Sequence, residues 1–297
     1  MSASASARCY VATSLQDALA ALGERGREGA VLAGGTWVMR ARLRGERHER
    51  AYVAVGRIEA FSRIEVDDKE LAIGAGVTHA ALADFLLPFG EFRALMQAAA
   101  KSANPAVRNM ATVGGNLCTT GFPAADLVPA LLCLDAEVEL RSSGSGPNRV
   151  PLSAFLAARE NLGAGNLLTR VMVPRRQRRS AHVRLPLRKT GDYPVAIVSA
   201  SCAATSDGSF SNPRIAIGSV EPTAMLWCGL QRKLDGGPLD PAAAAAAAAE
   251  TIGDLHGRDG VEAPGWYRLR VLPALVRRAV DEIRHDIQAH QSKCRLP

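Results

Sequence analysis

The sequence lacks the local signatures of most nucleotide-binding and metal-binding proteins. It has neither the GxGxxG turn of a Rossmann fold nor the GxxxxGK[ST] phosphate loop. Its six cysteines include no CxxC pair, which excludes a locally encoded iron–sulfur cluster or zinc knuckle. The six histidines show no metal-binding spacing, and the hydrolase motifs GxSxG and HExxH are absent as well.

Aromatic residues and long apolar runs are also scarce. Only 5% of the residues are aromatic, and the basic residues are not interleaved with them, so the net charge of +7 does not predict a nucleic-acid partner. No apolar run approaches the roughly 18 residues of a membrane span, and the first residues contain no signal-peptide core. We therefore expect a cytoplasmic protein without a membrane span, whose cysteines are reduced and mostly buried.

Hydrophobic periodicity divides the chain into two parts that meet near residues 174–180. With 297 residues, 47% of them hydrophobic, the chain can form two domains with substantial cores. The basic run Arg175–Arg179 at the junction is expected to be a solvated linker, with an acidic partner surface as the alternative. Helices are predicted over residues 14–23, 80–87, 92–103, 126–134, 152–158, 242–249 and 266–283. Strands are predicted over residues 30–32, 51–55, 70–73, 137–141, 149–150, 167–173, 195–204 and 215–220.

Two glycine-rich turns adjoin apolar runs that are far apart in the chain. The first is Ala33-Gly34-Gly35-Thr36, and the second is Ala111-Thr112-Val113-Gly114-Gly115-Asn116. A glycine pair lets the backbone approach a ligand closely with its N–H groups pointing outward, and a threonine hydroxyl stands beside each pair. Either pair alone is typical of an ordinary turn. Together they predict a cradle for the diphosphate of a dinucleotide cofactor.

An ordered series of segments then carries a family resemblance. In chain order the segments are Val31–Thr36, Ile73–His79, Val107–Leu117, Pro123–Leu132, Leu168–Pro174, Arg188–Tyr193 and Ala216–Thr223. The most specific of them is the string RNxATxGGN followed by PAAD. The series resembles the FAD-binding medium subunit of molybdenum hydroxylases, the family of xanthine dehydrogenase and aerobic carbon monoxide dehydrogenase. It extends over nearly the whole chain.

The resemblance implies an α+β fold with two domains. Residues 1–176 would form a two-part FAD-binding domain of the vanillyl-alcohol-oxidase type, whose two α/β lobes divide near residues 56–60. Residues 180–297 would form a small α+β domain of the carbon monoxide dehydrogenase flavoprotein type, with a three-stranded antiparallel sheet and helices. FAD would be the cofactor of this chain. A molybdenum cofactor and [2Fe–2S] clusters are expected in a large and a small partner subunit, because this chain offers no ligand set for them.

The resemblance also assigns roles to individual residues. Loops such as Val31–Val38 and Thr112–Asn116 hold the FAD pyrophosphate in this family through backbone N–H groups and hydroxyls. Asp126 matches an acid near the ribityl and ribose hydroxyls, and a carboxylate is a suitable acceptor for them. Leu168 matches an apolar contact to the adenine or the ring system. A helix cap is the alternative role for Asp126.

Three residues of the second part are implied near the flavin ring. Arg184 falls where many relatives have a lysine that faces the cofactor, Lys189 would add a second charge, and Tyr193 would lie against the isoalloxazine. A surface charge and a core aromatic are the alternatives for Lys189 and Tyr193. The complete implied set of cofactor-binding residues is Val31, Leu32, Ala33, Gly34, Gly35, Thr36, Trp37, Val38, Thr112, Gly114, Gly115, Asn116, Asp126, Leu168, Arg184, Lys189 and Tyr193.

The implied function is electron transfer. FAD would take electrons from the [2Fe–2S] clusters of a partner and pass them to an external acceptor such as NAD+, a quinone or O2. No residue of the chain is then required as a catalytic acid or base. Two alternatives remain: a stand-alone flavin oxidase of the same fold, and a non-catalytic assembly subunit with a decayed flavin site. Trp37, which stands where relatives have a small or polar residue, favours the last of these.

Overall fold

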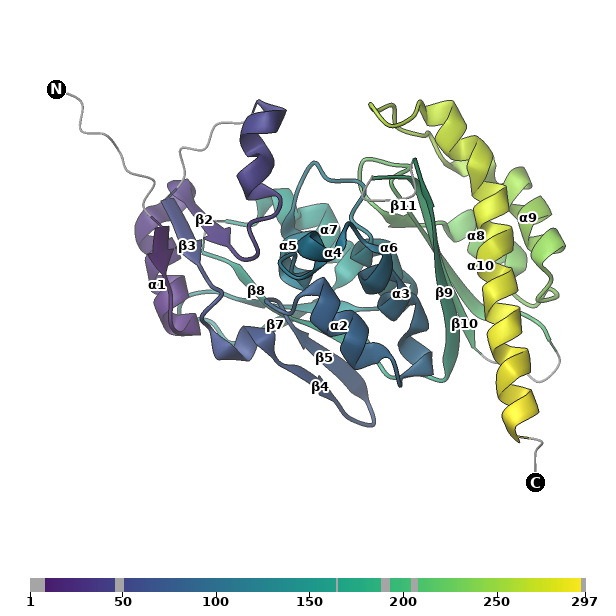
Figure 1. Cartoon of the computed structure of the whole chain (residues 1–297), viewed down its shortest axis with the longest axis horizontal. Helices are drawn as coiled ribbons and strands as arrows, with labels where there is room; N and C mark the ends of the chain where they lie inside the picture. The colour runs from purple at the N-terminus through teal and green to yellow at the C-terminus, as the bar shows by residue number, and fades with distance from the viewer. Residues whose placement is uncertain (1–8, 46–50, 164, 188–192, 204–207, 295–297) are drawn as a thin grey trace. The chain divides into compact units, whose positions relative to one another are not determined.

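The computed structural model describes residues 9–45, 51–163, 165–187, 193–203 and 208–294, with side chains up to residue 289. The chain forms two compact units, which Figure 1 shows with their helices and strands. Unit 1 consists of Met1–Ala81, Pro105–Thr120 and Glu137–Val173, and unit 2 consists of Leu82–Asn104, Gly121–Ala136 and Pro174–Pro297. Two segments that precede residue 174 therefore belong to the same unit as the C-terminal part of the chain.

Unit 1 contains a three-stranded parallel sheet with the strand order β1-β3-β2. Its strands are β1 (Cys9–Val11), β3 (Ala51–Ala54) and β2 (Gly29–Leu32). Helix α1 (Leu15–Arg25) starts after Ser14, whose hydroxyl oxygen accepts a hydrogen bond from the Asp17 N–H. The apolar stripe of α1 packs in one cluster with Val53 of β3, as its helical spacing predicts.

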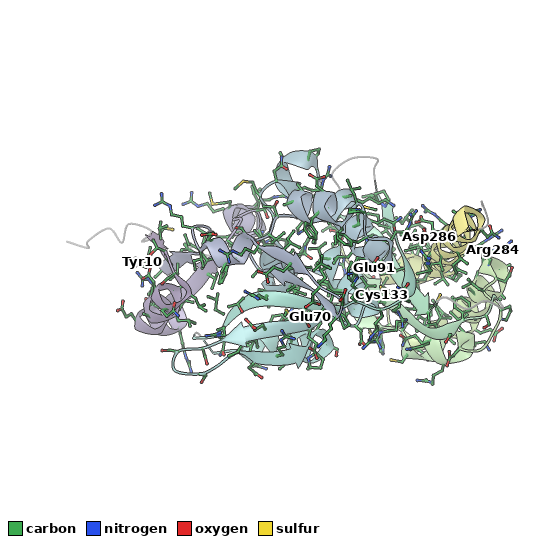
Figure 2. All side chains as sticks on the ribbon, turned by 90° about the horizontal axis from the view of Figure 1, so that it is seen from below. Tyr10, Glu70, Glu91, Cys133, Arg284 and Asp286 are labelled. Carbon is green, nitrogen blue, oxygen red and sulfur yellow. The ribbon has the colours of Figure 1, made fainter. Side chains whose placement is uncertain are left out.

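Unit 1 also contains a five-stranded sheet with the order β4-β5-β8-β6-β7. Its strands are β4 (Ile64–Val66), β5 (Glu70–Gly74), β8 (Leu167–Pro174), β6 (Glu137–Arg141) and β7 (Asn148–Pro151). Buried and partly exposed residues alternate along β6, so one face of this strand is apolar and the other is charged. Glu70, labelled in Figure 2, accepts two hydrogen bonds of 3.0 and 3.1 Å from the guanidinium of Arg149.

Short helices complete unit 1. They are α4 (Pro105–Arg108), α5 (Val113–Cys118) and α7 (Leu152–Ala158), with the 3₁₀ segments η1 (Gly26–Glu28), η2 (Val38–Arg44), η3 (Glu59–Ser62) and η5 (Arg159–Asn161). Helix α2 (His79–Leu86) begins in this unit. Segment η2 has no counterpart among the elements predicted from the sequence.

Unit 2 is built around a four-stranded antiparallel sheet with the order β12-β11-β10-β9. Its strands are β9 (Arg178–Pro186), β10 (Pro194–Ala203), β11 (Ser211–Gly218) and β12 (Met225–Leu226). The two-residue β12 is a fourth strand in a sheet for which three are predicted. The helices are α3 (Arg93–Lys101), α6 (Leu127–Cys133), α8 (Cys228–Leu234), α9 (Pro241–Glu250) and α10 (Gly265–Cys294), with η4 (Gly90–Phe92) and η6 (Ile252–Asp254).

The two faces of this sheet differ in chemistry. Apolar residues of β9, β10 and β11 form the core with α8, α9 and α10, which cover one face in Figure 1. The residues between them on β9 and β10 lie toward α3 and α6, because neighbouring strand residues point to opposite faces. Those residues are mainly polar: Ser180, His182, Ser199 and Ser201 are buried, and Arg184 is partly buried.

Only part of the basic run 175–179 is a solvated linker: Arg176 and Gln177 are exposed between β8 and β9, whereas Arg178 and Arg179 belong to β9. Arg178 begins β9 with only 6% of its surface exposed, and its guanidinium donates to the Ser201 hydroxyl oxygen at 3.1 Å and to the Asn212 carbonyl at 2.6 Å. The prediction was wrong for Arg178 because buried carbonyl and hydroxyl acceptors can satisfy an arginine inside the fold. The ion pairs of the neighbouring arginines are Arg175–Glu91 and Arg176–Asp135, each at 2.8 Å.

The cysteines are also more exposed than predicted. Cys9, Cys118 and Cys228 are exposed free thiols, and Cys133 and Cys202 are buried ones. Burial raises the pKa of the Cys133 thiol to about 12, so it stays protonated at neutral pH. Among the described residues, no helix is both long and apolar enough to cross a bilayer, and this includes the 30-residue α10.

Arg268 of α10 is a fully buried cation in unit 2. Its guanidinium donates to the carbonyls of Val195 and Ser219, at 2.6 and 3.0 Å, and to the Glu262 carboxylate at 3.0 Å. These contacts connect the first turn of the long helix to the start of β10 and to the residue after β11. Burying a charge is unfavourable unless it is paired and hydrogen-bonded, and here it is both.

We predict that Arg268→Met lowers the free energy of unfolding by about 3 kcal/mol, because two buried carbonyls and a carboxylate lose their donor. Urea denaturation followed by circular dichroism measures this. Arg270→Met, on an exposed position of the same helix, is the matched control and should change stability by less than about 0.5 kcal/mol. Equal effects of the two substitutions would contradict the assigned role of Arg268.

Candidate functional site

The first glycine-rich turn follows β2 directly and leads into η2. Gly35 has a φ of +69°, a backbone conformation that favours glycine. Within the described part of the chain, the N–H groups of Gly34, Gly35 and Thr36 donate to no protein acceptor. The turn thus presents three consecutive backbone donors, which is the chemistry that a diphosphate needs.

The first turn lies directly against the segment that precedes the second. A Cβ atom placed on Gly34 would stand 1.7 Å from the carbonyl oxygen of Met110 and 3.3 Å from the Cα of Ala111. No side chain fits in that space, so glycine at position 34 is required for the contact. The structure therefore brings the two glycine-rich turns together within unit 1, although more than 70 residues separate them.

The second turn is the start of a short helix rather than an open loop. Thr112 precedes α5 as its N-cap, and its hydroxyl oxygen accepts a hydrogen bond from the Gly115 N–H at 3.1 Å. The Gly114 N–H donates to the Ala75 carbonyl at 2.8 Å, and the Asn116 N–H donates to the Thr112 carbonyl at 2.9 Å. The three backbone donors that the resemblance assigns to phosphate are engaged within the protein in this structure.

Close packing explains the two glycines of this second turn. A Cβ atom on Gly114 would lie 2.8 Å from the Ala75 Cβ, and one on Gly115 would lie 2.9 Å from the Thr112 hydroxyl oxygen. Both distances are shorter than van der Waals contact. Gly114 thus lets the N-terminus of α5 lie against Ala75, which follows β5, and Gly115 leaves room for the Thr112 cap. The Thr112 hydroxyl accepts in the cap and retains its own hydrogen for another acceptor.

Asp126 lies in unit 2, immediately before α6, and is 5% exposed. Its side chain does not cap the helix, so the helix-cap alternative is wrong. Instead its Oδ1 lies 3.2 Å from Nε of Arg184 and 3.5 Å from Nε2 of His182. Arg184 also donates to the Lys101 carbonyl. The structure thus brings Asp126 and Arg184, two predicted cofactor residues, into direct contact.

His182 belongs to the same cluster, and its side chain is fully buried. Its Nδ1 lies 2.8 Å from the Ser199 hydroxyl oxygen, directly across β9 and β10, and its backbone N–H donates to Gln97 Oε1 at 2.8 Å. Burial lowers the pKa of His182 below its ordinary value, and the nearby Asp126 opposes this shift only partly. The imidazole is therefore neutral at neutral pH.

The other predicted residues lie in different surroundings. Leu168 is a buried residue of β8 in unit 1. Tyr193 is half-buried in unit 2, where its ring meets Phe122 edge-on at 5.2 Å. Trp37 stacks under the Arg44 guanidinium of η2 at 3.8 Å and accepts a hydrogen bond from it through its carbonyl. Lys189 lies outside the described residues.

Sequence reasoning missed His182 and Ser199 as parts of the site. The signal was present in β9, where Ser180, His182 and Arg184 alternate with the apolar Ala181 and Val183. Such alternation with polar residues normally marks a solvent-exposed face. Here α3 and α6 cover that face, so the polar residues become a buried cluster. Among the described residues, no group of histidine, cysteine or acidic side chains could hold a metal ion.

Two family models cover most of the chain. The model described as the FAD binding domain in molybdopterin dehydrogenase matches residues 4–176. The model of the CO dehydrogenase flavoprotein C-terminal domain matches residues 181–283. The first match alone covers more than half of the sequence.

Individual relatives match over almost their full length. The xanthine dehydrogenase FAD-binding subunit of Escherichia coli O157:H7 is 26% identical over 280 residues, which cover 91% of this chain and 94% of the relative. The alpha subunit of the 6-hydroxypseudooxynicotine dehydrogenase complex of Paenarthrobacter nicotinovorans is 29% identical, with 93% of both chains covered.

Solved structures give the same result for the fold. A chain of reconstituted CO dehydrogenase from Oligotropha carboxidovorans superposes with a TM-score of 0.83 at 26% identity. The match covers 95% of this chain and 98% of the other. This chain therefore belongs to the family of FAD-binding domains of molybdopterin dehydrogenases, and its C-terminal part belongs to the CO dehydrogenase flavoprotein C-terminal family.

Proposed function

We propose that this chain is the electron-transferring flavoprotein subunit of a cytoplasmic molybdenum hydroxylase complex. A small partner subunit would supply electrons from [2Fe–2S] clusters, and a large partner subunit with the molybdenum cofactor would act on the substrate. FAD, when bound, supplies the exchange between single electrons and electron pairs that an external acceptor requires. The observation that carries the proposal is a set of three backbone N–H groups, those of Gly34, Gly35 and Thr36, that donate to no acceptor among the described residues. They lie on the turn that the absence of a side chain at Gly34 allows to contact the segment before the second turn.

The proposal divides the work between two domains. Residues 1–176, organised as in the vanillyl-alcohol-oxidase type with lobes that divide near residues 56–60, would hold the nucleotide. Residues 180–297 would contribute side chains near the flavin ring. The family matches, which end at residue 176 and resume at residue 181, support this division.

The residues of the first turn, Val31–Val38, would bind the pyrophosphate. The N–H groups of Gly34, Gly35 and Thr36 are available as donors, and backbone donors need no rearrangement to meet a negative charge. In the second segment, Thr112 would donate its hydroxyl hydrogen to the pyrophosphate, and Asn116 would lie beside it. Gly114 and Gly115 would act indirectly, since their own N–H groups already have acceptors.

Residues outside the two turns would orient the rest of the cofactor. Asp126 would accept hydrogen bonds from cofactor hydroxyls, and Leu168 would provide apolar contact to the adenine or the ring. Arg184, Lys189 and Tyr193 would lie near the isoalloxazine. A fixed positive charge such as that of Arg184 stabilises negative charge that develops on a reduced ring.

Trp37, which stands where relatives have a small or polar residue, makes contacts within the protein. The Arg44 guanidinium stacks on the Trp37 ring, and η2, which carries Arg44, follows the turn directly. Trp37 is therefore accommodated by the protein itself, which weakens the interpretation that it marks a decayed site.

We predict that the purified chain binds about one FAD per molecule and binds FMN at least about tenfold more weakly, because FMN lacks the diphosphate bridge. Quenching of flavin fluorescence during titration measures both affinities. A folded chain that binds neither flavin would instead indicate a non-catalytic assembly subunit. Equal affinity for FAD and FMN would contradict the diphosphate cradle.

We predict that Gly34→Ala raises the dissociation constant for FAD at least about tenfold, because the new Cβ displaces the first turn from the Met110 carbonyl. Gly56→Ala is the matched control, since no atom lies within 4 Å of a Cβ at that position. It should change the constant by less than about twofold. The same loss in both variants would exclude a specific role for Gly34.

We predict that the FAD-loaded chain is reduced rapidly by a reduced ferredoxin-like small subunit of its own complex, but only slowly by alcohols. Anaerobic mixing, followed through the loss of flavin absorbance, measures the two rates. Co-purification with a molybdenum-containing large subunit is the accompanying check. Direct and rapid reduction by an alcohol would instead favour a stand-alone oxidase.

A further inference from the structure

Ser219 joins two segments of unit 2 that carry an aromatic pair, Phe122 and Tyr193. It follows β11 directly, is fully buried, and has a φ of +64°, a left-handed conformation that residues other than glycine seldom adopt. A serine in this conformation is unfavourable unless the surrounding contacts fix it. The hydrogen bonds of Ser219 provide that compensation, and they connect it to both segments.

The backbone of Ser219 holds the segment that contains Phe122. Its N–H donates to the carbonyl of Pro123 at 2.9 Å, and Pro123 is the residue after Phe122. Gly218 allows this approach, because a Cβ atom at that position would lie 2.9 Å from Cγ of Pro129 in α6. The end of β11 therefore lies against both the beginning of this segment and the helix that follows it.

The side chain of Ser219 holds the segment that contains Tyr193. Its hydroxyl donates to the carbonyl of Pro194 at 2.5 Å, and Pro194 follows Tyr193 and begins β10. The hydroxyl oxygen accepts from Nη2 of Arg258 at 3.1 Å and from Nη1 of Arg268 at 3.2 Å. Because two cationic donors occupy the oxygen, its one hydrogen is directed to the Pro194 carbonyl.

The two anchored prolines each adjoin one ring of the aromatic pair. The rings of Phe122 and Tyr193 meet edge to face, with their centroids 5.2 Å apart and their planes at 68°. Pro123 and Pro194 restrict the positions of these neighbours, because the peptide bond is planar and the proline ring fixes φ. One serine thus fixes the pair through one backbone and one side-chain hydrogen bond.

We propose that Ser219 is a positioning residue for Tyr193: its buried hydroxyl holds the start of β10 so that the tyrosine ring lies against the isoalloxazine of FAD. The inference rests on the proposed function, because it takes Tyr193 as a ring contact of the cofactor. It assigns to Ser219 no contact with FAD and no part in electron transfer. The edge-to-face arrangement leaves at least one face of the tyrosine ring uncovered by Phe122, and stacking needs one face.

Removal of the hydroxyl should weaken FAD binding through Tyr193. Ser219→Gly removes the hydroxyl and relieves the left-handed conformation, so the variant retains a favourable backbone. Ser219→Ala removes the hydroxyl and retains the unfavourable conformation. In both variants Pro194 loses this donor, and the ring of Tyr193 is held less firmly. Equal effects of the two substitutions on FAD binding would assign the loss to the hydroxyl rather than to the backbone.

The test is a double-mutant cycle in the full chain, with the dissociation constant of FAD measured by equilibrium dialysis. Tyr193→Leu should raise the constant about fivefold, because a stacked aromatic ring is lost. Ser219→Gly and Ser219→Ala should each raise it about fivefold when Tyr193 is present, and less than about twofold in the Tyr193→Leu background. Thermal melting of each apoprotein verifies that it is folded.

The fluorescence of bound FAD is the second readout, because a tyrosine ring in contact with the isoalloxazine quenches it. Ser219→Gly should raise this fluorescence as Tyr193→Leu does, and the double variant should raise it no further. Thr251→Val is the matched control, since it removes a hydroxyl of unit 2 that donates to the Ala247 carbonyl of α9 at 2.9 Å. It should change the affinity by less than about twofold and leave the fluorescence unchanged.

Three results would overturn the inference. The first is unchanged FAD affinity and fluorescence in Ser219→Gly. The second is an equal loss of affinity from Ser219→Gly in both backgrounds, because such an effect would not act through Tyr193. The third is unchanged affinity and fluorescence in Tyr193→Leu, a result that requires no substitution at Ser219 and leaves the flavoprotein assignment intact. An unmodified chain that binds no FAD removes the proposed function as well.

Discussion

The contact between Gly34 and the Met110 carbonyl is the constraint on which the candidate site depends. The carbonyl occupies the place of a side chain at position 34, so only glycine lets the turn after β2 reach the segment before α5. That approach brings together two parts of unit 1 that the sequence keeps far apart. This contact also places the turn so that the N–H groups of Gly34, Gly35 and Thr36 donate to no acceptor among the residues that the structure describes. Successive backbone donors in a partly exposed turn form a concavity of the kind that binds anions.

Much of the fold follows from local patterns in the sequence. Helices α1 and α9 lie close to the predicted ranges 14–23 and 242–249, and their caps, Ser14 and Asp240, act within three residues. Local patterns predicted neither η2 nor the strand β9, whose first residues were interpreted as a linker. The arginine run at residues 175–179 resembles a solvated segment, yet Arg178 finds its acceptors on β10 and beside β11. Such acceptors are distant in sequence, so periodicity contains no information about them.

The same reason limits what could be predicted of the site. The two glycine turns were found from composition, but the use of their donors was not, since the Gly114 N–H bonds to Ala75 across 39 residues. Asp126 was found through the family resemblance, and its partner His182 was not. Three contacts join α3 to alternate residues of β9, from Ala94 to Ser180, from Gln97 to His182 and from Lys101 to Arg184. The contacting residues are three or four positions apart along α3 and two positions apart along β9, as expected when one face of a helix packs on one face of a strand. The sequence does not show that these two elements pack together.

Hydrogen exchange of the backbone amides, with and without FAD, tests the account most directly. In the free chain the amides of Gly114, Gly115 and Asn116 should already exchange slowly, because they are hydrogen-bonded, whereas those of Gly34, Gly35 and Thr36 should exchange rapidly. Addition of FAD should slow exchange at positions 34–36 and change positions 114–116 little. Exchange at positions 34–36 that is the same with and without bound FAD would contradict the claim that this turn grips the diphosphate.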